Sequence, residues 1–120
     1  MNPAPTTSQP SGPSPDLLRG HLDLILLSIL EARPLYGFAI IQAAKERTNG
    51  YFDFREGSLY PALHRLEAAG LLGSELGEAG RNGKPRKYYL LTDAGRETLT
   101  VKRREFETFT GAVNSLRGAL

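Results

Sequence analysis

The stretch EGSLYPALHRLEAAG, residues 56–70, predicts the helix on which the fold depends. Ser58 is a good N-cap, and Pro61 then lies in the first turn, where a missing N–H costs little. Gly70 is suited to end the helix. The apolar stripe recurs at helical spacing and consists of Leu59, Ala62, Leu63 and Leu66. A different face carries polar and aromatic side chains, which we expect to be exposed.

Two helices are predicted before this one. The first begins near Asp16 and ends before Pro34, which disfavours helical geometry in the residue ahead of it. Its apolar face has the spacing i, i+3, i+4, i+7 and i+8 in Leu22, Ile25, Leu26, Ile29 and Leu30. The second runs from about Tyr36 to Thr48, and Asn49-Gly50 stops it. Residues 51–54 then form a short extended aromatic stretch.

Two strands are predicted after residue 70. Leu71–Gly77 is the first, and Arg86–Leu91 is the second, with side chains that alternate between two faces. Asn82-Gly83 lies between them and is the strongest short signal for a hairpin turn. Because the connection is long and rich in glycine, we expect its tip to protrude.

A long helix begins at Thr92, an N-cap residue. Its apolar residues recur at steps of 7, 3, 4, 3 and 4, with Lys102 as the polar interruption. They are Leu99, Phe106, Phe109, Val113, Leu116 and Leu120. The whole order predicts a mainly α fold with a small β-hairpin, a winged helix-turn-helix followed by a long C-terminal dimerisation helix.

The chain therefore divides into three predicted parts. Residues 1–15 form a disordered Pro-rich tail, residues 16–91 the winged-helix domain, and residues 92–120 the dimerisation helix. The sequence has no cysteine, which excludes disulfides, thiolate metal sites and a cysteine nucleophile. It has no apolar run long enough for a membrane span and no secretory signal at its start, so a cytoplasmic location is expected.

Two groups of residues are candidates for DNA binding. The net charge is only +2, so the placement of the charges matters more than their sum. On the helix over residues 56–70 the candidates are Ser58, Tyr60, His64 and Arg65, in the position of a recognition helix. At the hairpin they are Arg81, Lys84, Arg86 and Lys87, which could neutralise phosphates. Each group alone also fits an ordinary solvated surface, but the two together favour DNA binding.

The apolar seam of the last helix is too long for a small winged-helix core. A two-fold dimer would bury the same patch twice, and the predicted dimer contacts are Leu99, Phe106, Phe109, Val113 and Leu116. Dimers of this kind read two half-sites about one helical turn apart, roughly 34–36 Å. The alternative is that the helix folds back onto its own domain. The dimer is favoured because the seam lies beyond the wing, at the end of the chain.

Three stretches resemble the PadR family of bacterial transcriptional regulators. LYGFAI, residues 35–40, is similar to the start of the family's second helix, and EGSLYPALHRLE, residues 56–67, to its recognition helix. GKPRKYYLLT, residues 83–92, is similar to its wing strand and the next helix start. The long combined pattern, which covers residues 18–120, is far more specific than any single piece. The single C-terminal helix resembles the family's short subfamily.

This resemblance implies a homodimeric regulator, usually a repressor, that a small molecule or another signal releases from an inverted-repeat operator. It places recognition contacts on Ser58, Tyr60, His64 and Arg65, and wing contacts on Arg81, Lys84 and Arg86. Some short members bind flat aromatic drugs between paired tryptophans at the dimer interface. This sequence has no tryptophan, and Phe106 stands at the corresponding place, so a dimer core is the better interpretation there.

Other classes of function fit the sequence less well. An enzyme is not expected, because His21 and His64 have no catalytic partner in a motif, and no phosphate-binding loop or metal-ligand spacing is present. No cofactor, metal or membrane partner is expected. The rival is a winged helix that binds protein, although such a module has little need for four basic residues at its wing. Glu75 and Glu78 weaken the DNA interpretation slightly, and the sequence does not separate a repressor from an activator.

Overall fold

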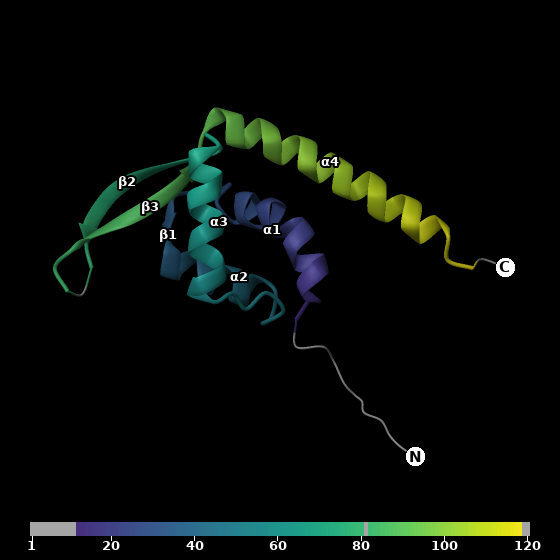
Figure 1. The fold of residues 1–120 in the computed structure, drawn as a ribbon, viewed down its shortest axis with the longest axis horizontal. Coiled ribbons are helices and arrows are strands. Elements are labelled where there is room, and N and C mark those ends of the chain that lie inside the picture. The colour runs from purple at the N-terminus through teal and green to yellow at the C-terminus, as the bar shows by residue number, and fades with distance from the viewer. Residues whose placement is uncertain (1–11, 81, 119–120) are drawn as a thin grey trace, which may run out of the picture.

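The helices and strands follow the predicted order with one addition. A computed structural model describes residues 12–80 and 82–118 (Figure 1). In that part of the chain the elements are α1 (Pro15–Ile29), β1 (Leu35–Tyr36), α2 (Gly37–Arg47), α3 (Glu56–Ala68), β2 (Leu72–Ala79), β3 (Pro85–Leu91) and α4 (Asp93–Ser115). The predicted disordered tail falls mostly on residues 1–11, which lie outside the described residues. Residue 15, placed in that tail, is instead the first residue of α1.

Side-chain caps begin two of the helices. The Ser14 hydroxyl accepts the Leu17 N–H at 3.2 Å at the start of α1, and the Thr92 hydroxyl accepts the Gly95 N–H at 3.0 Å at the start of α4. These caps satisfy N–H groups that have no partner within the helix. The prediction for Thr92 is confirmed.

The predicted cap of α3 is wrong. The helix begins at Glu56, with Arg55 in the cap position and no side-chain cap hydrogen bond. The Arg55 carbonyl already accepts the N–H groups of Ser58 and Leu59, at 3.1 and 3.0 Å. Ser58 therefore lies inside the first turn with an exposed side chain. Side-chain type alone favours Ser58 as the cap, but the backbone is already helical at Glu56, two residues earlier.

The sheet has one strand that the sequence did not reveal. Its order is β1-β3-β2, and both neighbouring pairs are antiparallel. Leu35 and Tyr36 of the short β1 lie opposite Tyr89 and Tyr88 of β3. The aromatic stretch 51–54, predicted as extended, belongs to no strand. The sheet thus ties the entrance of α2 to the base of the hairpin.

A single apolar core joins all the helices to the base of the sheet. Its most enclosed side chains are Leu26, Leu27, Leu30, Ile40, Leu59, Leu63 and Leu66. All four residues of the apolar stripe predicted on α3 are buried there, which confirms that stripe. Each such leucine or isoleucine contributes about 1.5–3 kcal/mol through burial. The core fixes α3 and the start of the hairpin relative to α1.

Helix α4 leaves the domain as it proceeds. Leu99, near its start, is 2% exposed and belongs to the core. Its C-terminal half extends beyond the other helices, on the side away from the hairpin (Figure 1). The helix ends at Ser115, with Leu116 in the C-cap position, so it is shorter than the predicted 92–120. Among the described residues, no helix is long and apolar enough to cross a membrane.

Candidate nucleic-acid interface

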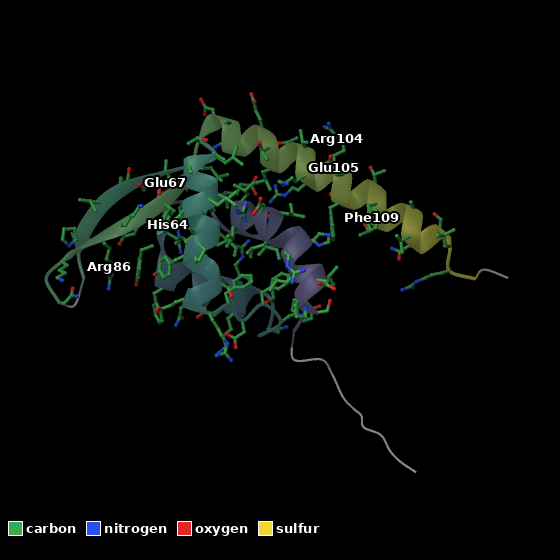
Figure 2. All side chains as sticks on the ribbon, viewed as in Figure 1. His64, Glu67, Arg86, Arg104, Glu105 and Phe109 are labelled. Carbon is green, nitrogen blue, oxygen red and sulfur yellow. The ribbon has the colours of Figure 1, made fainter. Side chains whose placement is uncertain are left out.

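Helix α3 and the hairpin form one end of the molecule. The hairpin projects from the C-terminal end of α3, and α4 points to the opposite side (Figure 1). His64 and Glu67 lie on α3 and Arg86 on the hairpin, whereas Phe109 lies far away on α4 (Figure 2). A helix beside a protruding hairpin is the arrangement with which a winged helix spans a groove and the adjacent backbone.

The exposed surface of α3 offers Ser58 and His64. Both side chains are exposed. A hydroxyl and an imidazole N–H can donate hydrogen bonds to phosphate oxygens or to base edges. Their placement agrees with the sequence-based expectation that this face of the helix is open.

Tyr60, the third predicted contact on α3, is half-buried. Its ring packs so closely on Gly37, the first residue of α2, that a Cβ at Gly37 would overlap the ring. Burial raises the pKa of the Tyr60 hydroxyl, and the negative charge of Glu56 adds to the shift. The hydroxyl end of the ring therefore packs against the start of α2 and holds α3 there. Contact between Tyr60 and DNA stays a prediction.

Arg65 is engaged by another helix. Its guanidinium donates two hydrogen bonds to Asp23 of α1, at 2.8 and 3.1 Å. These hydrogen bonds lower the pKa of Asp23 and raise that of Arg65. A bidentate pair of this kind is among the stronger polar contacts. Contact between Arg65 and DNA stays a prediction, and it would require the guanidinium to leave or share this carboxylate.

The cations of the hairpin differ in what they contact. Lys84 is exposed and Arg86 half-exposed, and within residues 12–80 and 82–118 neither forms an ion pair. The Arg86 guanidinium lies 4.2 Å from the centre of the Tyr36 ring, which in turn meets Tyr88 edge to face. Such stacking orients a guanidinium without neutralising it. The predicted contact at residue 81 lies outside the described residues.

Lys87 faces α3. Its ammonium donates to Glu67 at 3.0 Å and lies 5.1 Å from the centre of the Tyr89 ring. The hydrogen bond to Glu67 raises the pKa of Lys87. This cation is therefore already matched by a carboxylate, unlike Lys84 at the tip. Contact between Lys87 and DNA stays a prediction, and it would require the ammonium to leave or share the Glu67 carboxylate.

A tight turn around Gly83 forms the tip of the hairpin. Gly83 has a φ of 78°, a left-handed conformation that favours glycine. The Asn82 side chain accepts the Lys84 N–H at 3.2 Å, and the Gly80 N–H donates to the Lys84 carbonyl at 2.7 Å. The predicted Asn-Gly turn is confirmed, and it presents Lys84 at the end of the hairpin.

Helix α4 carries a second surface, apolar and remote from the first. The exposed fractions are 40% for Phe106, 63% for Phe109, 47% for Val113 and 83% for Leu116. Leu99 does not share this surface, because the core of its own domain covers it. The predicted dimer seam is thus divided, and four of its five residues remain open to a partner.

An apolar groove of about 610 Å³ runs beside this surface. It lies between α1, the C-terminal end of α2 and the middle of α4, and its lining includes Leu17, Leu24, Ile25, Phe52, Phe106 and Phe109. His21 packs edge to face on Phe106, with ring centres 5.4 Å apart. No group of three or more metal-ligating side chains occurs among the described residues.

Comparison with known proteins agrees with this architecture. The sequence profile described as "Transcriptional regulator PadR-like family" matches residues 26–101. The chain belongs to the PadR-like family of transcriptional regulators. It shares 38% identity over 85 residues with an uncharacterised protein of Lysinibacillus sphaericus. The aligned region covers 71% of this chain and 77% of that protein.

Two further similarities are to proteins described as transcriptional regulators. A region of 51 residues is 53% identical to the transcriptional regulator Rv3488 of Mycobacterium tuberculosis, and it covers 42% of this chain and 46% of that protein. The structure of a transcriptional regulator from Clostridium thermocellum superposes with a TM-score of 0.77 at 32% identity, over 86% of this chain and 99% of that one. The winged-helix fold and a role in transcriptional regulation therefore hold for this PadR-family chain.

Sequence reasoning missed several residues of this interface. Asp23 and Glu67 hold two of the predicted DNA contacts, and Tyr36 supports Arg86. Asp23 is 42 residues from Arg65, and Glu67 is 20 from Lys87, so no local spacing connects them. The adjacency of Tyr36 and Gly37 is the signal that could have pointed to a tightly packed aromatic cluster.

Proposed function

We propose that this PadR-family protein is a homodimeric, sequence-specific transcriptional repressor that binds an inverted-repeat operator. One observation carries the DNA-binding part. Lys84 and Arg86 protrude on the hairpin and pair with no carboxylate among the described residues, and the exposed Ser58 and His64 lie on the neighbouring α3. Cations left open in this way can release counterions from phosphates, and a polar helix face can read base edges.

Within this proposal the two groups of residues have different tasks. The exposed Ser58 and His64 discriminate between bases, with Tyr60 as a further contact at the edge of this face, while Lys84 and Arg86 grip the backbone. The domain over residues 16–91 contains both groups. Arg65 and Lys87, which are already paired, chiefly hold the reading surface in shape.

The C-terminal helix joins two copies. Phe106, Phe109, Val113 and Leu116 form an apolar strip that a lone chain leaves in water, and a two-fold interface would cover the strip on both copies at once. The groove beside it would receive apolar side chains of the partner's corresponding helix. Two domains held in this way can address half-sites about 34–36 Å apart. A dimer of this span would block a promoter that overlaps its site.

The groove also supports control by a small molecule. Its lining is predominantly apolar, and its volume of about 610 Å³ falls in the range of small-molecule sites. An apolar inducer that entered between α1 and α4 would change how the two domains are held apart, and so release the operator. We place this regulator in the cytoplasm, as a DNA-binding protein without catalytic activity.

Selection from a random duplex pool tests the proposal. Purified protein is incubated with random DNA, and the bound fraction is amplified and sequenced over several rounds. We expect enrichment of an inverted repeat whose half-site centres are about one helical turn apart. A pool that stays random would contradict sequence-specific binding and would favour the rival function, a winged helix that binds protein. Enrichment of a single half-site would contradict the proposed dimer but would leave sequence-specific binding intact.

A further inference from the structure

Glu67 connects α3 to both strands of the hairpin. Its Oε1 accepts a hydrogen bond from the Lys87 ammonium of β3 at 3.0 Å, and its Oε2 accepts one from the Ser74 hydroxyl of β2 at 2.7 Å. Each carboxylate oxygen thus holds a different strand. Figure 2 shows Glu67 on α3 near the base of the hairpin, away from the wing tip.

The other contacts that can fix the angle of the wing lie at its base and along β3, where β1 pairs with β3 and Arg86 stacks on Tyr36. The chain passes from α3 to β2 through Gly70, whose φ of 81° makes the reversal easy but does not stiffen it. Leu72, Tyr89 and Leu91 anchor the base of the hairpin in the core. Farther along β2, the Leu76 side chain is 72% exposed, so it does not anchor this strand to the core.

The Glu67 carboxylate is well suited to this task because it stays ionised. The hydrogen bonds from Ser74 and Lys87 lower its pKa below the ordinary value of 4.5. A carboxylate that accepts from an ammonium makes a charge-assisted hydrogen bond, stronger than one between neutral groups. Both of its donors lie on strands, so loss of Glu67 frees the hairpin without opening the core.

We propose that Glu67 is a positioning residue for DNA binding, one that sets the wing at the angle from which Lys84 and Arg86 reach the backbone while α3 lies in the groove. This role rests on the proposed function. Glu67 is negatively charged, as DNA is, but in this role it favours DNA binding because it holds the two strands of the wing in place.

The sign of one substitution separates this role from simple electrostatics. Glu67→Ala removes a negative charge near the DNA, which by charge alone would strengthen binding. The positioning role predicts the opposite, since a loose wing must be ordered when it binds. Glu75→Ala is the matched control, because Glu75 is an exposed residue of β2 and forms no ion pair with any described residue.

The binding experiment uses both variants on one selected operator duplex over a range of salt. We expect Glu67→Ala to bind more weakly than the wild type and to lose about 0.9 from the salt slope for each phosphate contact that the wing no longer makes. Glu75→Ala should bind as well as the wild type or better. The charge swap Glu67→Lys with Lys87→Glu should recover part of the loss. Tighter binding by Glu67→Ala, or equal gains in both variants, would overturn the role.

A measurement without DNA separates failure of this role from failure of the proposed function. Because the chain has no cysteine, spin labels can be placed at Asn82→Cys on the wing tip and Glu46→Cys on α2 alone. Dilution with unlabelled protein restricts the pulsed electron–electron distance to one chain. We expect a broader distance distribution in Glu67→Ala than in the wild type. An unchanged distribution would overturn the role, whereas a broader one in a protein that selects no DNA sequence would contradict the proposed function alone.

Discussion

The two halves of α4 carry the same apolar spacing and do different things. In the first half, Gly95 and Leu99 are buried against the domain, and Arg103 pairs with Glu31 of the loop after α1 at 2.7 Å. In the second half, Phe109 and Leu116 are mostly exposed. The spacing of 7, 3, 4 and 3 runs through both halves, with Lys102 as its polar interruption. Periodicity therefore identifies a face of a helix, but it does not say which surface covers that face.

The glycines of α4 sharpen this contrast. A Cβ on Gly95 would overlap the Leu71 carbonyl, the same carbonyl that accepts the Thr92 N–H at 3.2 Å. A Cβ on Gly111 would meet nothing within 4 Å. At Gly95 the first half is therefore packed against backbone that cannot yield, whereas at Gly111 the second half stands clear of its own domain.

Gly95→Ala should have the largest effect on folding. We expect it to lower the free energy of unfolding by about 3 kcal/mol, the upper end for overpacking, because the contact is with backbone. The matched control, Gly111→Ala, should raise the stability by about 0.5–1 kcal/mol, as alanine favours helix. Urea denaturation of both variants measures these values. Similar effects of the two substitutions would erase the contrast between the halves.

Phe109→Glu should break the dimer and leave the domain folded. A charge in the apolar strip is expected to cost about 2 kcal/mol or more in association, about thirtyfold in the dissociation constant. Sedimentation equilibrium would report monomers, and circular dichroism an unchanged helix content. The control is Val101→Glu, which places the same charge at an exposed position of α4 outside the strip. A variant with Glu at residue 109 that still sediments as a dimer would place the interface elsewhere.

The Glu31–Arg103 pair should give the smallest effect, and it should depend on pH. Hydrogen bonding from Arg103 lowers the pKa of Glu31 below 4.5. A lowered pKa in the folded state gives stability that is present above pH 4.5 and disappears as the pH falls below it. Since both side chains are more than a third exposed, Arg103→Gln should cost only about 0.5 kcal/mol near neutral pH. Thermal unfolding at acid pH should show no difference, and a difference that persists there would assign the cost to packing.

Local patterns predicted the elements well and their partners poorly. The buried stripe of α3, the hairpin turn and the cap at Thr92 follow from neighbours in sequence, and the structure confirms them. The strand β1 has two residues, too few to show alternation, and it exists because β3 lies beside it. To predict that Leu99 is buried in its own domain, one must know how α4 packs across that domain.

The candidate site shows the same limit. The sequence indicated which residues are basic, and it placed Lys84 on an open turn. It gave no sign that Asp23 holds Arg65 or that Glu67 holds Lys87, because both pairs form between distant segments. Residue type thus indicates where the candidate interface lies. Which of its cations pair with carboxylates, and which do not, depends on the tertiary structure.

Binding to the DNA upstream of the protein's own gene tests the central claim most directly. Fluorescence anisotropy would compare that duplex with a scrambled duplex of the same length, at several salt concentrations. We predict tight binding that prefers the native sequence and weakens steeply as salt rises. Weak binding, equal on the two duplexes near physiological salt, would contradict sequence-specific binding to this promoter and would favour the rival function, a winged helix that binds protein.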